Sequence, residues 1–294
     1  MSIPFSKYSG CGNDFILIDN RHLQLKADPE AISFLCHRRH GIGADGVIFL
    51  ESSPVTTFRM RIFNADGGEA EMCGNGLRCL AHYIHAQDIQ TQDQEITGNC
   101  FTIETMHHCL GVQVHGNQVT ISMPLPPPGS FFKELRLDEQ TLLLHTINTG
   151  VPHAVCFVDD LEKQTYMQIA PKIRHHQSFH PQGTNVNFAK IISGDTIAVR
   201  TYERGVEQET LACGTGATAV AVVAAAIHRM SSPIHIKTLS GDCLTVSFQG
   251  IPPNLTELTL TGPALKVYDG LIPYEGVLPM DFICTLGSHP LKSA

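Results

Sequence analysis

The residues with the clearest chemistry are two cysteines, each followed by a Gly-x-Gly tripeptide. Cys73 begins Cys-Gly-Asn-Gly, Cys213 begins Cys-Gly-Thr-Gly, and a candidate helix follows each motif. A cysteine at the N-terminus of a helix lies at the positive end of the helix dipole, which favours the thiolate. The glycines expose backbone N–H groups that can bind an anion such as a carboxylate. Each motif therefore combines a reactive sulfur with an anion cradle.

Two such motifs can do more than one if they face each other across a substrate. One thiolate would remove the proton from a single carbon, and the opposite thiol would deliver a proton from the other side, which inverts the configuration. The helix ends would hold the substrate carboxylate and stabilise the negative charge that develops on it. This chemistry needs no cofactor in principle, so the pattern favours proton exchange at an α-carbon.

Other uses of cysteine and histidine fit the sequence less well. Thiol oxidoreductases generally use a close Cys-x-x-Cys pair, and the sequence contains none. The histidine-rich groups at 37–40, 107–109 and 175–176 lack four ligands at zinc-site spacing. Residues 41–46 match Gly-x-Gly-x-x-Gly, but an apolar run follows them where the dinucleotide fingerprint needs a helix. We therefore expect no metal, no nucleotide, and a turn that leads into a strand at 41–46.

The cysteine motifs belong to an internal repeat. Three blocks recur in the same order: residues 69–76 as 209–216 at an offset of 140, 10–19 as 150–159 at 140, and 61–64 as 200–203 at 139. Three ordered blocks at almost one offset indicate a duplicated half. We expect two similar domains related by a pseudo-two-fold axis, each with its cysteine turn at the start of a central helix.

The hydrophobic pattern predicts a mixed α+β fold with many short strands and few helices. The expected helices are residues 29–40, 76–87, 166–176 and 216–230, and the last is apolar on every side, which is typical of a buried helix. We expect each domain to be a mixed sheet wrapped around its central helix. The predicted domains are residues 1–122, to which 264–294 return, and residues 123–263. Leu125–Gly129 is interpreted as a stiff connector between the halves, and the segment after Gly270 as a surface tail.

The composition excludes several classes of protein. The 294 residues are 43% hydrophobic and carry a formal net charge of −8, with no basic run, which argues against nucleic acid and an anionic membrane as partners. The longest strictly apolar run, residues 219–227, is too short to span a bilayer. Ten cysteines without a recognisable secretory signal predict free thiols in a reducing cytoplasm. We expect an amino acid as the binding partner, and the chain could assemble as a homodimer.

Taken together, the motifs resemble the diaminopimelate epimerase family. The matching segments are Gly12–Phe15, Phe63–Gly67, Glu71–Cys79, Tyr202–Gly205 and Glu209–Gly216. The resemblance covers nearly the whole chain, from about Phe5 to Tyr268. It implies a PLP-independent, two-base epimerase that interconverts LL- and meso-diaminopimelate for lysine and cell-wall synthesis. It also implies two similar domains with the active site in the cleft between them.

The resemblance implies a role for each matching residue. Cys73 and Cys213 would be the two acid/base thiols. The anion cradles at the helix starts would be formed by Gly74, Asn75, Gly214 and Thr215. The distal amino-acid head would be bound by Asn64, Asn187, Glu203 and Arg204, with Asn13 as a further amide. Such a head is a zwitterion, so an amide together with both signs of charge suits it.

Three features depart from the pattern of some family members. Gly46 stands where some members have Gln, and Val151 stands where some have Asn before the Pro-His pair. An extra residue also lies near Glu207-Gln208. We therefore expect two polar substrate contacts to be missing, and we expect slow activity on a smaller acidic amino acid such as glutamate.

Three alternative functions remain open at this point. One is a proline-racemase-like amino-acid racemase, whose first motif usually has His where Asn75 stands. A phenazine-synthesis type of isomerase would lack the thiols, and both cysteines are retained. The third alternative is a non-catalytic small-molecule binding module, which would not exchange the α-proton of its ligand with solvent.

Overall fold

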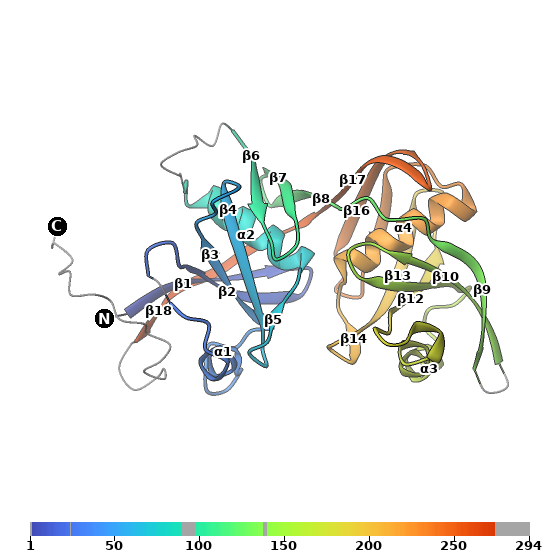
Figure 1. Ribbon diagram of the computed structural model, residues 1–294, viewed down its shortest axis with the longest axis horizontal. Coiled ribbons are helices and arrows are strands. Elements are labelled where there is room, and N and C mark those ends of the chain that lie inside the picture. Colours follow the sequence, from blue (N-terminus) through green and yellow to red (C-terminus); the bar gives the residue numbers. More distant parts are fainter. Residues whose placement is uncertain (1, 24, 90–97, 138–139, 274–294) are drawn as a thin grey trace. The chain divides into compact units, whose positions relative to one another are not determined.

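The structure is a computed structural model, and it describes residues 2–23, 25–89, 98–137 and 140–273 (Figure 1). Contacts between Cα atoms divide the chain into two compact units. Unit 1 runs to Val114 and resumes at Ala264, and unit 2 comprises His115–Pro263. No helix in the described ranges is both long enough and apolar enough to cross a membrane.

Unit 1 is a mixed sheet with two helices. Its elements are β1 (Ser2–Gly10), β2 (Asn13–Asp19), α1 (Pro29–Cys36), β3 (Gly46–Glu51), β4 (Phe58–Asn64), β5 (Glu69–Ala70), α2 (Gly74–Ala86), β6 (Cys100–Glu104), β7 (Cys109–His115) and β18 (Leu265–Pro273). The strand order is β18–β1–β2–β3–β4–β6–β7, and the short β5 also pairs with β4. The β2–β3 and β4–β6 pairs are parallel, and the other pairs are antiparallel.

Unit 2 repeats this arrangement. Its elements are β8 (Gln118–Ser122), β9 (Ser130–Leu137), β10 (Gln140–Asn148), β11 (Pro152–Phe157), α3 (Thr165–Arg174), a 3₁₀ turn (Gln177–Phe179), β12 (Asn185–Ile191), β13 (Thr196–Glu203), β14 (Gln208–Thr210), α4 (Gly214–His228), β15 (Ile234–Lys237), β16 (Cys243–Ile251) and β17 (Asn254–Pro263). The order is β9–β10–β11–β12–β13–β15–β16–β17–β8, with β14 also on β13. The parallel pairs, β11–β12 and β13–β15, occupy the same places as those of unit 1.

Each unit has one central helix that its own sheet surrounds (Figure 1). Helix α2 packs against β1, β2, β3, β4 and β18, and α4 packs against β10, β11, β12, β13, β15 and β16. Residues 216–225 of α4 are all buried, as the all-apolar pattern predicts. The expected fold, a mixed sheet wrapped around a central helix in each of two similar halves, is confirmed.

The register of the strands corrects the offset of one repeated block. Phe49 on β3 and Phe188 on β12 are equivalent, because each lies opposite an arginine of the repeated block on the next strand, Arg61 or Arg200. On the other side, Phe49 lies opposite Ile18 and Phe188 lies opposite Cys156. Ile18 therefore corresponds to Cys156, and the offset for this block is 138 rather than the predicted 140. A slip of two residues keeps every side chain on the same face of a strand, so the hydrophobic pattern cannot distinguish the two alignments.

The junctions between the units also differ from the prediction. β8 pairs with β17 along its whole length, so it lies in unit 2 and the predicted boundary at residue 122 comes too late in the chain. Leu125–Gly129 lies between β8 and β9, both in unit 2, so it does not connect the halves. The chain returns to unit 1 through β18, which pairs with β1 as far as Pro273. The remainder of the expected surface tail, 274–294, lies outside the described residues.

Helix α1 is shorter than predicted. Asp28 caps its N-terminus by accepting from the backbone N–H of Ala31, but the helix ends at Cys36 rather than at residue 40. His37 explains the early end, because its Nδ1 accepts from the backbone N–H groups of Arg39 and His40. A side chain that bonds the following backbone replaces the helical bonds with a turn.

Candidate active site

Both candidate cysteines are the N-cap residues of their helices. The Sγ of Cys73 accepts from the backbone N–H of Gly76 at 3.4 Å, and the Sγ of Cys213 accepts from Gly216 at 3.4 Å. An N-cap side chain satisfies a backbone donor that has no partner within the helix, here with sulfur in place of the usual oxygen. The cysteines therefore lie at the positive helix termini, as the motif predicts, and both helices begin two residues earlier than expected.

The second glycine of each motif is closely packed against other side chains. A Cβ added at Gly76 would lie 2.9 Å from the Cδ1 of Ile62, a residue of β4. A Cβ added at Gly216 would lie 2.5 Å from the Oδ1 of Asn187 and 3.3 Å from the Sγ of Cys213. Glycine at these positions lets the start of each helix approach the sheet that carries the neighbouring polar residues.

In unit 1, amides surround the start of α2. Asn75 is buried, and its Nδ2 donates to the Oδ1 of Asn13 at 2.5 Å. Its Oδ1 in turn accepts from the guanidinium of Arg78 at 2.7 Å. Cys73 itself is half-buried. The structure thus brings the predicted Asn13, Gly74 and Asn75 together around the first cysteine.

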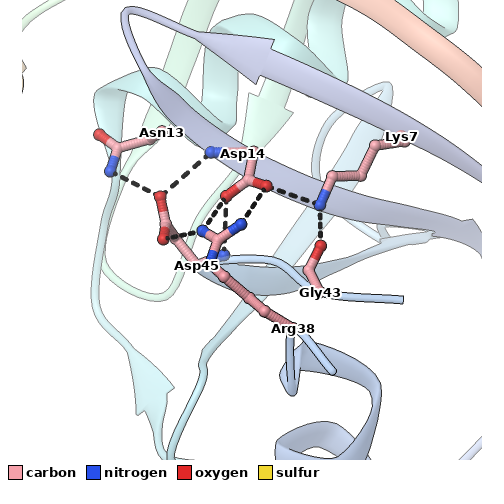
Figure 2. Close-up of polar contacts among 6 residues, drawn as sticks. All are labelled: Lys7, Asn13, Asp14, Arg38, Gly43 and Asp45. Carbon is pink, nitrogen blue, oxygen red and sulfur yellow. Dashed lines mark hydrogen bonds and ion pairs between the residues drawn. The ribbon is translucent and has the colours of Figure 1, made fainter. Parts of the chain in front are cut away.

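Asn13 is held by a network of charged residues (Figure 2). Its Nδ2 donates to the Oδ2 of Asp45 at 3.2 Å, and Asp45 is paired with Arg38 at 2.8 Å. Arg38 also pairs with Asp14 at 2.7 Å, and buried Lys7 pairs with the same carboxylate at 2.8 Å. Burial alone would raise the pKa of Asp14, but its bonds to Arg38 and Lys7 outweigh burial and lower that pKa to about 2. The network therefore stays ionised at neutral pH, and it fixes the amide that meets Asn75.

In unit 2, a chain of polar groups leads to Cys213. The Sγ of Cys213 lies 3.4 Å from the Oγ1 of Thr215, and that hydroxyl lies 3.0 Å from the Nε2 of His153. The Nδ2 of Asn187 lies 3.1 Å from the Nδ1 of His153. An amide N–H can only donate, so Nδ1 is the acceptor and Nε2 carries the hydrogen that His153 donates to Thr215. The hydroxyl hydrogen of Thr215 is then available to the sulfur.

His153 is neutral in this arrangement. Its side chain is buried, which lowers its pKa to about 3, and the charge of Arg204 acts in the same direction. A neutral imidazole can donate through only one nitrogen, so its tautomer fixes the direction of the chain that ends at Cys213. His153 follows Val151 and Pro152 in the sequence, and the Pro-His pair of the family motif was the signal that could have identified it.

Asn187 has a different place from the predicted one. It has no exposed surface, and its Nδ2 also donates to the backbone oxygen of Ala154 at 3.1 Å. Its Oδ1 accepts from the hydroxyl of Thr201 at 3.0 Å. Since both ends of the amide are used inside unit 2, Asn187 orients His153 and does not offer a group to a distal head.

Asn185, which sequence reasoning missed, contacts Arg204, one of the predicted binding residues. Its Oδ1 accepts from the backbone N–H of Arg204 at 2.8 Å, and its Nδ2 donates to the backbone oxygen of Pro152 at 3.2 Å. Asn185 and Asn187 lie on the same face of β12, so the alternation of the strand does not separate them. Arg204 is half-buried, and Asn64 is exposed at the end of β4.

Glu203, which is half-buried, and the buried Cys213 form an acidic pair. The carboxyl group of Glu203 hydrogen-bonds the thiol of Cys213. Burial raises the pKa of Glu203, and burial followed by the charge of Glu203 raises the pKa of Cys213 well above its usual range. The hydrogen bonds from Thr215 and Gly216 act in the opposite direction. At neutral pH Cys213 is therefore protonated.

An Arg–Glu ion pair occurs at the same place in both units, on the short strand that precedes each cysteine. The sequence reasoning missed this pair. Arg61 binds Glu69 through two hydrogen bonds of 2.8 Å, which join β4 to β5. Arg200 binds Glu209 in the same way at 2.6 and 2.9 Å, which joins β13 to β14. All four residues lie in the repeated blocks, so their recurrence as an Arg…Glu pair was an available signal. Bidentate pairs of this kind add geometric specificity.

Each unit thus places one thiol at a helix terminus, with amides near Cys73 and hydroxyl and carboxyl groups near Cys213. The described residues contain no group of three or more His, Cys, Asp or Glu placed to hold a metal ion. Residues 41–46, which match the glycine pattern, form a bend that leads into the strand β3 at Gly46, in agreement with the expected strand.

Comparison with known proteins places these features in a family. A family model described as diaminopimelate epimerase matches residues 5–121 and 145–264. A diaminopimelate epimerase from Aquifex aeolicus is 39% identical over 285 residues, which cover 93% of this chain and 99% of that one. A diaminopimelate epimerase from Archaeoglobus fulgidus is 39% identical over 289 residues, covering 92% of this chain and 97% of that one.

Solved structures share the fold at much lower identity. A hydroxyproline epimerase from Agrobacterium vitis, with bound trans-4-hydroxy-L-proline, has a TM-score of 0.69 at 14% identity and covers 97% of this chain and 96% of its own. A PhzF-family phenazine biosynthesis protein from Bacillus anthracis has a TM-score of 0.69 at 16% identity and covers 93% and 99%. At this identity the likeness concerns the fold alone.

Proposed function

The chain belongs to the diaminopimelate epimerase family, and we propose that it interconverts LL- and meso-diaminopimelate by moving the α-proton between Cys73 and Cys213. It is an isomerase of a family that works without pyridoxal phosphate. The observation that carries the proposal is the repeated cysteine N-cap, which gives both sulfurs the same position at a helix start. The match to the family over both halves supports the substrate.

The proposed reaction is a two-base proton transfer. The thiolate of one cysteine takes the α-proton and becomes a thiol, and the electron pair of the broken C–H bond remains on the substrate as an enediolate-like anion. The other thiol then gives its proton to the opposite face of the carbon and becomes a thiolate. The backbone N–H groups at the helix starts, with Asn75 and Thr215, stabilise the charge on the substrate carboxylate. Each turnover exchanges the charges of the two sulfurs.

The polar chain of unit 2 supports the step at Cys213. His153 donates its Nε2 hydrogen to the hydroxyl oxygen of Thr215, so the hydrogen of that hydroxyl can point to the sulfur. When Cys213 loses its proton, Thr215 therefore donates a hydrogen bond to the new thiolate. His153 and Asn187 are therefore positioning residues that act through Thr215. Glu203 lies against the sulfur, so we assign it to the reacting end of the substrate and leave Asn64 and Arg204 to bind the distal head.

The nature of the reaction can be tested by solvent exchange. Purified enzyme with LL-diaminopimelate in D₂O should form the meso isomer with one solvent deuterium at the inverted carbon, observed by NMR and mass spectrometry. A non-catalytic binding module would give no deuterium at Cα. Exchange on proline, but not on diaminopimelate, would instead support a proline-racemase-like activity.

A cytoplasmic location is proposed together with this activity. Every described cysteine is free of a disulfide, and Cys36, Cys79 and Cys156 are buried as thiols. Free thiols persist in reducing compartments. The only partner that the mechanism requires is the amino-acid substrate.

A further inference from the structure

The two helix starts differ in the charge that lies beside them. Arg78 is the largest side chain in the described residues that has almost no exposed surface. Its guanidinium donates to the backbone oxygen of Gly74 at 3.4 Å and to the Oδ1 of Asn75 at 2.7 Å, the two residues that follow Cys73. It also reaches the Sγ of Cys11 at 3.3 Å. A buried positive charge therefore lies at the first turn of α2, bonded to both of the residues that follow the reactive cysteine.

The equivalent position in unit 2 is neutral. Thr218 stands five residues after Cys213, as Arg78 stands five residues after Cys73. The Oγ1 of Thr218 donates to the backbone oxygen of Gly214 at 3.0 Å, so it bonds the same helix carbonyl as Arg78 without bringing a charge.

A second pair of equivalent residues also differs in charge, and here unit 2 has the negative group. Tyr202 lies opposite Val186 as Phe63 lies opposite Val47, so the next residues, Glu203 and Asn64, correspond. Unit 2 thus has a carboxyl group against its cysteine where unit 1 has a neutral amide. An adjacent cation favours a thiolate and an adjacent carboxylate disfavours one, and both effects grow in a buried environment.

We propose that Arg78 keeps Cys73 as the thiolate of the resting enzyme, while Cys213 rests as the neutral thiol. Within the proposed two-thiol function, on which this inference rests, Cys73 is the resting base and Cys213 the resting acid. The substrate isomer whose α-proton faces Cys73 then reacts with the resting enzyme directly. The other isomer requires the proton arrangement left by a preceding turnover or by exchange with solvent.

Among the described residues, the carboxylates that act on α2 have cations of their own, since Asp19 pairs with Arg21 and Asp269 pairs with Lys266. The ionisable groups that act on the helix or lie on it are Tyr8 on β1, Cys11 after β1, Asp19 on β2, Arg21 after β2, Asp269 on β18, and Cys79, His82, Tyr83 and His85 on α2 itself. At the helix start, β3 and β4 present Ile48 and Ile62. The network of Figure 2 contains two cations and two anions, so it adds no net charge near Asn13.

The test measures the ionisation of each sulfur separately. Full-length protein is pulsed with iodoacetamide from pH 5 to pH 10, and alkylation of the Cys73 and Cys213 peptides is followed by mass spectrometry. In the unmodified chain the pH midpoint for Cys73 should lie below that for Cys213. Arg78→Gln should reduce alkylation of Cys73 at pH 7 by at least about tenfold, because an adjacent charge shifts a pKa by one unit or more. Arg78→Lys, which keeps the charge, should retain most of the reactivity.

Thr218→Val is the matched control, since it changes the equivalent position of α4 without changing charge, and it should leave the Cys73 profile unaltered. Equal midpoints for the two sulfurs in the unmodified chain, or an unchanged Cys73 profile in Arg78→Gln, would overturn the proposal. Equal loss in Arg78→Lys and Arg78→Gln would also overturn it, because the role would then be structural. If Arg78→Gln does not fold, the unmodified chain still tests the proposal, which requires a lower pH midpoint for Cys73 than for Cys213. Alkylation does not require turnover, so failure here is distinguishable from absence of epimerase activity.

Discussion

At the scale of single residues, the direction of the polar chain in unit 2 depends on one buried amide. Asn187 donates to Nδ1 of His153, which leaves the Nε2 hydrogen for Thr215. The same amide accepts from Thr201. Nothing exposed takes part, so the tautomer of His153 is decided inside unit 2 before any ligand arrives.

Removing this amide should be costly. Asn187→Ala leaves the buried hydroxyl of Thr201 and the Nδ1 of His153 without their partner, at about 1–3 kcal/mol for each buried group left unsatisfied. We expect a lower free energy of unfolding in chemical denaturation and a reduced kcat, because Thr215 is no longer oriented. Asn64→Ala, at an exposed amide, is the stability control and should change the free energy of unfolding by less than about 0.5 kcal/mol. Equal stability of the two variants would contradict this role of Asn187.

Substrate range is a second residue-scale question. Gly46 and Val151 offer no polar side chain, whereas Asn64 and Arg204, which we assign to the distal head, are retained. We expect slow α-proton exchange on L-glutamate, whose side-chain carboxylate can approach Arg204. Loss of the distal ammonium leaves the amide of Asn64 without that partner in the bound state, which should lower the rate by roughly 5- to 150-fold relative to diaminopimelate. Incubation of the enzyme with L-glutamate in D₂O measures this. Deuterium no higher than in a Cys73→Ala control would refute the expectation.

At the scale of elements, the helix starts set the position of the sulfurs. Gly216 allows α4 to begin within reach of Asn187, and an added methyl group would press on both the amide and the sulfur of Cys213. We expect Gly216→Ala to destabilise the protein by about 1–3 kcal/mol and to lower activity. Gly194→Ala is the matched control, because a Cβ at Gly194 meets nothing within 4 Å. Wild-type stability and activity of Gly216→Ala would show that this close approach is not needed.

The elements also show what the sequence could and could not predict. The cysteine motifs, the four helices and the duplicated mixed sheet followed from residue types and spacing. The start of α2 at Gly74 did not, because cysteine is an unusual N-cap residue and its role depends on the Sγ contact with Gly76. The sequence also could not tell which asparagine of β12 lies near Arg204. Asn185 and Asn187 share one face of the strand, and only the structure shows that Asn187 contacts His153. The boundary between the two units was predicted too late in the chain, because it depends on the pairing of β8 with the distant strand β17 and not on local composition.

At the scale of the whole molecule, the two units share a topology and differ in their chemistry. Duplication provides the same strand order, the same Arg–Glu pair and the same cysteine N-cap in each unit. The residues at the helix starts have diverged, with Arg78 in one unit and Glu203 in the other. A reaction that inverts a carbon needs two proton carriers in different protonation states, and we propose that the unequal charges of the two units serve this need.

The central claim is that one cysteine from each unit carries the proton. The most direct measurement is net LL-to-meso epimerisation by Cys73→Ala and Cys213→Ala, with Cys243→Ala as the control at an exposed free cysteine of β16. Each of the first two variants should lose at least about a thousandfold in rate, because inversion needs an acid and a base on opposite faces, and the control should keep wild-type activity. Net inversion within about tenfold of wild type in either single variant would contradict the account.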